Sequence, residues 1–368
     1  MYDYMQLFFR NYFLTGICFL MCTFCLNTNV FGQIKPDIIP EDFITEETHV
    51  TCHCKPGVRN KSRSKGLELT FGRLGGGTFI SDENGSDELS DYSSLNQFGV
   101  NLKFPVVNKD ALKILLGYKY FSERFNFDDV GVPFQETFQR LDDARLKSNS
   151  ISVIVSKPLN ETKYLAFRLR YSTNGDYNSF IAFEGRYSIY KFLGIYGIKP
   201  NDDFEWGVGL SINRSFRNNN VLPFVVYNRT FSDRWGIEAI LPASVYMRCN
   251  FNPDLILLMG ANFNSSSYRI DTEDDFPNNQ LSYAFNHSEI LPGVELEYKI
   301  SNWVWANLNL GYQINLSSDF DSRNDNTPFF TADPTNSVFF RVGVFLSPPD
   351  HFGDKDDKKH DHDHNHNH

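Results

Sequence analysis

Histidine alternates with aspartate or asparagine at the C-terminal end of the chain. Five imidazoles occupy every second position, with two carboxylates between them: His360, Asp361, His362, Asp363, His364, His366 and His368. Alternate side chains of an extended chain fall on one side, so neighbouring imidazoles and carboxylates could chelate Zn²⁺, Ni²⁺ or Cu²⁺. The segment has almost no apolar residues, so a disordered, solvated tail without a metal function is the alternative. No cofactor is required by any other pattern in the sequence.

A second group of soft metal ligands lies near the N-terminus. It consists of His49, Cys52, His53 and Cys54. Structural zinc sites use two spaced pairs of ligands, and this spacing does not match that pattern. The group is therefore a weaker candidate than the C-terminal histidines, with which it could share an ion.

Charged side chains occur at alternate positions in several apolar segments of the middle of the chain. They are expected to line the inside of a barrel: Lys103, Arg168, Arg170, Glu205, Glu238, Arg248, Glu295, Glu297 and Arg341. Such charges could form the constriction of a pore. Alternatively, they could pair with one another and fill the interior.

Nucleophilic catalysis has little support in the sequence. Residues 66–346 contain a single histidine, His287, which precedes Ser288 and Glu289. Neighbouring residues of a strand point to opposite faces, so His287 and Ser288 do not form a catalytic pair. We therefore predict that the protein is not an enzyme, with a barrel hydrolase as the least favoured function.

The elements that carry these residues are predicted from two-residue periodicity. Val304, Leu308 and Leu310 belong to the clearest apolar row, which runs to Ile314 and is interleaved with polar side chains. Similar rows recur along residues 66–346, and one includes Leu222, Phe224 and Val226. No apolar run after the N-terminal leader is long enough for a membrane-spanning helix. The pattern predicts an all-β fold, a transmembrane antiparallel up-and-down barrel of about 14 strands.

The connections between the predicted strands alternate in length. Short turns lie near residues 108–110, 158–160, 200–202, 232–233, 252–254 and 301–302, and long loops are expected at residues 75–95, 126–147, 266–279 and 317–335. Short periplasmic turns and long external loops are typical of membrane barrels, and an even strand number places both termini in the periplasm. The short connection Leu241-Pro242-Ala243 is an exception, and if it is only a bulge the count falls to about 12. Pro292-Gly293 is expected to bulge its strand.

The ends of the chain differ in composition from this body. Residues 1–32 have a positive flank at Arg10 and an apolar core, which is typical of a signal peptide. We predict a periplasmic N-terminal segment at 33–65, acidic first and then basic, a barrel at 66–346 and a disordered tail at 347–368. The formal net charge of -10 argues against a nucleic-acid partner.

Taken with the aromatic-rich final strand at 337–346, these features resemble Gram-negative outer-membrane β-barrel proteins. The chain is more narrowly similar to an uncharacterised barrel family in which a proline follows a strand, as in Ile240-Leu241-Pro242. The resemblance implies residence in the outer membrane and two partners, its lipid and the barrel-assembly machinery. We expect a passive, porin-like channel or a conduit for an unknown small solute. The alternative is a structural barrel that binds partners through long acidic loops.

Overall fold

Nearly all of the described chain is β-strand. The computed structural model describes residues 56–83, 86–129, 135–179, 184–214, 216, 219–271, 282–322 and 328–348. Besides the α-helix α2 (Gln135–Asp143) and the 3₁₀ turn η2 (Gly185–Tyr187), its elements are the strands β1 (Leu67–Glu83), β2 (Ser86–Lys109), β3 (Leu112–Asp129), β4 (Leu146–Pro158), β5 (Lys163–Gly175), β6 (Ser188–Asn201), β7 (Phe204–Arg214), β8 (Asn219–Thr230), β9 (Trp235–Leu241), β10 (Ser244–Asn252), β11 (Leu255–Asp271), β12 (Ser282–Lys299), β13 (Val304–Ser322), β14 (Pro328–Pro334) and β15 (Ser337–Leu346).

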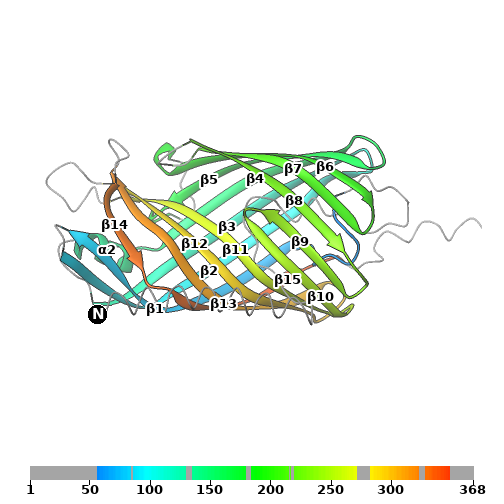
Figure 1. Cartoon of the computed structure of the whole chain (residues 1–368). Coiled ribbons are helices and arrows are strands. Elements are labelled where there is room, and N and C mark those ends of the chain that lie inside the picture. The colour runs from blue at the N-terminus through cyan, green and yellow to red at the C-terminus, as the bar shows by residue number, and fades with distance from the viewer. Residues whose placement is uncertain are drawn as a thin grey trace, which may run out of the picture.

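The strands close into one antiparallel barrel (Figure 1). Each strand from β1 to β13 pairs with the next along the chain, and β14 and β15 each pair with both β13 and β1 to complete the ring. Because β14 and β15 lie one after the other between β13 and β1, the barrel has 14 strand positions, as predicted. The connection at Pro242 separates β9 from β10, which pair directly at Ile240 and Ser244. The alternative count of twelve is therefore wrong.

The outer face of the barrel is apolar, and much of the inner face is polar. In β13, Leu310, Tyr312 and Ile314 point outward and are exposed, whereas Asn309 and Gln313 are buried inside. Leu169 on β5 is 60% exposed on the outer face. We call these exposed apolar side chains of the outer face the apolar belt. A surface of this type contacts lipid in membrane barrels.

Strand β8 departs from the predicted alternation. Phe224 and Val226 point inward and are buried, and Val221 and Val225 occupy the exposed face. The strand is apolar on both faces, so its alternation could not determine which side meets lipid. Pro223 pairs with Leu210 inside the strand, and the register of β12 with β13 shifts between Ser288 and Glu289, not at the predicted Pro292-Gly293.

Two of the predicted long loops, 75–95 and 317–335, are mostly strand in the described residues, and 126–147 contains α2. β1 and β2 extend to residues 83 and 86, and β3, β11 and β13 continue beyond the predicted loop starts. Hydrogen bonding between neighbouring strands extends these hairpins although their sequences are polar. The barrel is consequently tall at β1–β3 and β11–β13 and low at β7–β10, which are 7 to 12 residues long.

We call the side of the short turns the turn end and the opposite side, which carries α2 and β14, the loop end (Figure 1). At the loop end, Gly175, the last residue of β5, pairs with Arg269 of β11, which is not a neighbour of β5 in the barrel. The Asp176 amide donates to the Arg269 carbonyl (3.2 Å), and the Asn174 side chain donates to the Ser267 carbonyl (3.0 Å). Among the described residues, no helix is long and apolar enough to cross a membrane.

Candidate functional site

The barrel encloses a polar cavity of about 450 Å³. Its lining begins at Lys65 and Glu68, on the turn-end side, and reaches Asn213 and Asn220, at the loop-side ends of β7 and β8. A cavity of this volume is typical of sites for small molecules. The cavity therefore extends along the barrel from the turn end toward the loop end.

One wall of the cavity is basic. Its cations come from the inner faces of β2, β3, β5 and β6: Lys103, Lys119, Arg168, Arg170 and Lys191. Arg170 lies directly opposite Lys191 in the pairing of β5 with β6. Like charges in directly opposed positions destabilise a sheet, so this wall carries an electrostatic cost within the fold.

The facing wall is rich in amides. Asn262 and Asn264 come from β11, Asn307 and Asn309 come from β13, and Glu295 lies between them on β12. The amide nitrogens of Asn307 and Asn309 donate to Glu295 at 3.1 and 3.4 Å. The cavity thus has cations on one side and hydrogen-bonding groups on the other.

The turn end is occupied by residues 56–65, which we call the N-terminal plug. Lys65 Nζ lies 2.9 Å from Glu295, 3.0 Å from Glu68 and 3.5 Å from Glu297. Burial lowers the pKa of the Lys65 ammonium, but the attraction of these three carboxylates outweighs burial and raises the pKa well above its usual value. Lys65 therefore holds the plug as a charged group inside the barrel.

Further contacts attach the plug to the strands opposite β1. The Ser62 amide and hydroxyl donate to the two carboxylate oxygens of Glu238, at 3.1 and 2.9 Å. The Gly57 amide donates to Glu205 at 3.1 Å. At the rim, Arg59 pairs with Asp203 (2.9 Å) and with Asp233. The plug thus contacts the turn-end parts of β7, β9, β12 and their turns.

The charges predicted to line the lumen separate into two groups in the structure. Five line the cavity: Lys103, Arg168, Arg170, Glu295 and Arg341. The other four face the plug or its anchors: Glu205, Glu238, Arg248 and Glu297. Sequence reasoning noted the basic run from Arg59 to Lys65 but missed its position inside the barrel. The complementary charges of this run and the inner glutamates were the available signal.

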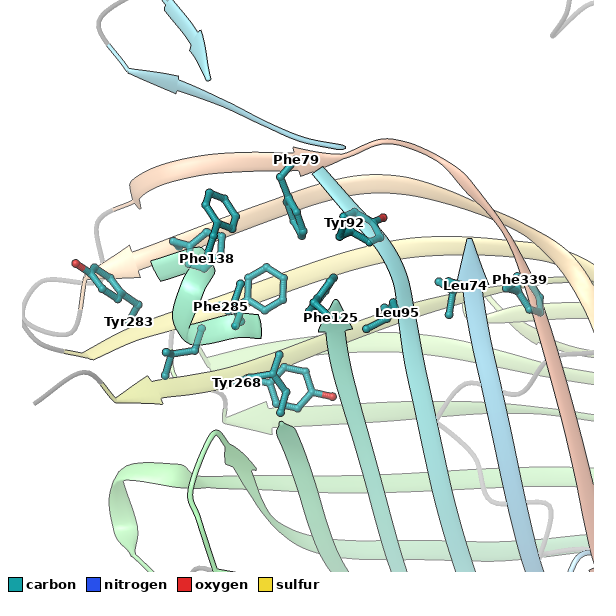
Figure 2. Close-up of a cluster of buried hydrophobic side chains, with 14 of the residues drawn as sticks. Leu74, Phe79, Tyr92, Leu95, Phe125, Phe138, Tyr268, Tyr283, Phe285 and Phe339 are labelled. Carbon is teal, nitrogen blue, oxygen red and sulfur yellow. The ribbon is translucent and has the colours of Figure 1, made fainter. Parts of the chain in front are cut away.

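The loop end is closed by buried aromatic side chains, which we call the aromatic cluster. Phe79, Phe125, Phe138, Phe285 and Phe320 form its centre, and Phe138 is contributed by α2 (Figure 2). The ring centroids of Phe285 and Phe320 are 4.8 Å apart, and those of Phe79 and Phe138 are 5.3 Å apart. Aromatic burial of this extent contributes strongly to stability, so the cluster belongs to the core of the fold.

A polar network that includes His287 lies near the aromatic cluster. Its Nδ1 is 2.7 Å from the Ser318 hydroxyl, and its Nε2 is 3.2 Å from Glu289. The prediction considered only the adjacent Ser288, whereas Ser318 reaches His287 from the neighbouring strand. Ser318 is 0% exposed, and a nucleophile needs access to its substrate. The geometry therefore fits a buried hydrogen-bond network better than a catalytic triad.

Both predicted groups of metal ligands lie outside the described residues. This applies to His49, Cys52, His53 and Cys54, and to the C-terminal group from His360 to His368. Within the described ranges, no group of three His, Cys, Asp or Glu side chains is arranged to hold a metal ion. The described cysteine, Cys249, is buried and not in a disulfide.

Comparison with protein families finds one model that matches residues 81–347. The chain belongs to this family, which is described as a domain of unknown function (DUF6268). The matched region extends from the end of β1 through β15 and includes both walls of the cavity, but not the plug. Among curated proteins, none matches this chain in sequence.

Comparison with solved structures gives matches of low sequence identity. A Pseudomonas aeruginosa FadL homologue is 9% identical with a TM-score of 0.40, and the match covers 76% of this chain and 90% of that chain. The COG4313 outer membrane channel from Pseudomonas putida F1 is 10% identical with a TM-score of 0.36, covering 79% and 99%. The NanC porin is 10% identical with a TM-score of 0.32, covering 76% and 99%. The fold assignment rests on the strand pairing of this chain itself.

Proposed function

We propose that the protein is an outer-membrane conduit for a small polar solute, gated at its turn end by the N-terminal plug. The observation that carries this proposal is a polar cavity in a closed barrel whose turn-end mouth is occupied by residues 56–65. The apolar belt supports a membrane location, since exposed apolar side chains such as Leu169 and Leu310 have lipid as their natural contact.

The nature of the contacts supports a gating role for the plug. The plug is held by ion pairs and hydrogen bonds at the rim and in the mouth, and Arg63 and Lys65 also stack on the rings of Trp305 and Phe345. The rim contacts of Arg59, whose side chain is 37% exposed, exchange readily for water when the segment moves, because an exposed ion pair contributes only about 1 kcal/mol to stability. At the loop side, the cavity reaches the ends of β7 and β8, and it borders the aromatic cluster at Tyr268 and Leu291.

The arrangement also suggests an orientation. Both ends of the described chain lie at the turn end, where the Ser347 amide bonds to the Trp303 carbonyl and the plug bonds to neighbouring turns. Short turns face the periplasm in bacterial barrels. On this proposal the plug is periplasmic, and the tall hairpins of β1–β3 and β11–β13 face outward from the cell.

Single-channel recording in a planar bilayer tests the conduit. The Arg59→Ala/Ser62→Ala variant removes rim and mouth contacts of the plug, each worth about 1 kcal/mol, and should raise the open fraction roughly thirtyfold. Lys61→Ala is the matched control, since Lys61 lies in the same segment and makes no ion pair among the described residues. Equal recordings for the double variant and the wild type would contradict gating by the plug. Silence of all three proteins would contradict the conduit.

A structural barrel without transport is the second candidate, and the aromatic cluster is the observation that favours it. Phe79, Phe138 and Phe320 are completely buried where an open porin has water. In that case the tall loop-end hairpins would be the functional surface, and neither plug variant would conduct.

A further inference from the structure

The charge of the central cavity indicates what kind of molecule it accommodates. Among the described residues, seven basic and four acidic side chains line it. Two of the four carboxylates, Glu68 and Glu295, contact Lys65 of the plug. The basic side chains outnumber the acidic ones, so the described lining of the cavity has a net positive formal charge.

The spacing of these cations concentrates the charge. Arg168 and Arg170 lie two residues apart on the same face of β5, and Lys191 lies directly opposite Arg170 on β6. Three positive charges in adjacent positions repel one another, and the repulsion falls when an anion lies between them. Guanidinium groups bind carboxylate and phosphate oxygens through paired hydrogen bonds.

The facing wall adds an independent observation. Asn262 and Asn309 line the cavity and are only 4% and 6% exposed. Within the described part of the chain, the amide oxygens of both residues have no hydrogen-bond partner. Buried acceptors are nearly always satisfied, so a bound molecule with donor groups, such as hydroxyls, would complete this wall.

We infer that the cavity binds a small hydroxylated organic anion, with its carboxylate or phosphate at Arg168, Arg170 and Lys191 and its hydroxyls at Asn262 and Asn309. This inference rests on the proposed function, since the bound anion would be the solute of the conduit. The cavity volume of about 450 Å³ accommodates a molecule of the size of a sugar acid or a sugar phosphate.

Isothermal titration of the full mature chain in detergent micelles tests the site without requiring conduction. The probes are gluconate, glucose 6-phosphate and glucose, which share hydroxyl groups and differ in charge. Gluconate or glucose 6-phosphate should bind, and the tighter of the two identifies the preferred anionic group. Glucose should bind at least roughly tenfold more weakly. Equal binding of all three sugars, or of none, would overturn the inference.

Two variants locate the site. Arg170→Gln/Lys191→Gln should weaken binding of the preferred anion roughly tenfold or more. Arg145→Gln/Lys157→Gln, which removes the same charge from exposed positions outside the cavity lining, should leave it unchanged. Asn262→Leu should weaken gluconate binding and leave butyrate, which has no hydroxyl group, unaffected. Equal losses in both double variants would show non-specific charge attraction and contradict the site.

The outcomes for binding and conduction are separable. Anion binding without conductance would contradict the conduit and retain the site. Conductance that gluconate and glucose 6-phosphate do not alter, together with absent binding, would retain the conduit and contradict the anion site.

Discussion

The two ends of the barrel are closed in physically different ways. At the turn end, a segment without regular structure is held by charged and polar contacts such as Lys65–Glu295 and Ser62–Glu238. At the loop end, strands that form the wall bring their own aromatic side chains together with Phe138 of α2. Polar groups bond to water when their contacts break, which offsets most of the free-energy cost. Aromatic rings have no such compensation when they become exposed to water. On the proposed function, the turn end has the removable closure and the loop end the permanent one.

The largest effect is expected at the loop end. Phe320 is 0% exposed and contacts both Phe285 and Phe138. Phe320→Ala should lower the free energy of unfolding by about 3–5 kcal/mol, because it removes buried surface and leaves a cavity. Denaturant unfolding in micelles measures this change. Phe231→Ala, in the exposed turn after β8, is the control and should cost much less. Similar losses at both positions would contradict the view that the aromatic cluster is a core element.

A smaller effect is expected in the barrel wall between the two ends. Leu169 lies in the middle of β5 and is exposed on the outer face, so a charged side chain at this position would face lipid. Leu169→Arg should cost about 2–4 kcal/mol near the centre of a bilayer, whereas a charge near the interface costs about 0–1 kcal/mol. Leu159→Arg, in the turn after β4, is the matched control. Refolding titrations into lipid vesicles compare the two variants, and equal costs would mean that the apolar belt does not face lipid.

The contrast between the two ends also explains what the sequence could predict. The barrel wall was predictable because most strands alternate apolar outer residues with polar inner residues, as Leu310 and Asn309 do in β13. Strand β8 was misjudged because Phe224 and Val225 make both of its faces apolar, and only the barrel decides between them. Polar segments such as residues 86–94 form strand through pairing with β1, which alternation does not detect.

The site was less predictable than the wall. Alternation predicts which charged side chains face the interior of the barrel, but it does not predict which residues they pair with. Ser62 and Glu238 are 176 residues apart, and Lys65 and Glu295 are 230 apart. Their pairing depends on the order in which the strands close around the barrel. The contact of Gly175 at the end of β5 with Arg269 of β11 likewise joins strands that are not neighbours, and alternation does not reveal it.

The smallest effect should appear at the plug. Ser62→Ala removes the hydroxyl that donates to Glu238 and keeps the backbone contact, so it should weaken the attachment by about 1 kcal/mol. Trypsin cleavage after Lys61 or Arg63 requires the plug to leave the mouth, and its rate follows the detached fraction when opening is fast. The variant should be cleaved roughly fivefold faster than the wild type, with no change in the unfolding of the barrel. Ser64→Ala is the matched control, since Ser64 has no hydrogen bond from its side chain within the described residues. Faster cleavage accompanied by barrel unfolding would show that the plug belongs to the core, as the aromatic cluster does, and the distinction between the two ends would then be lost.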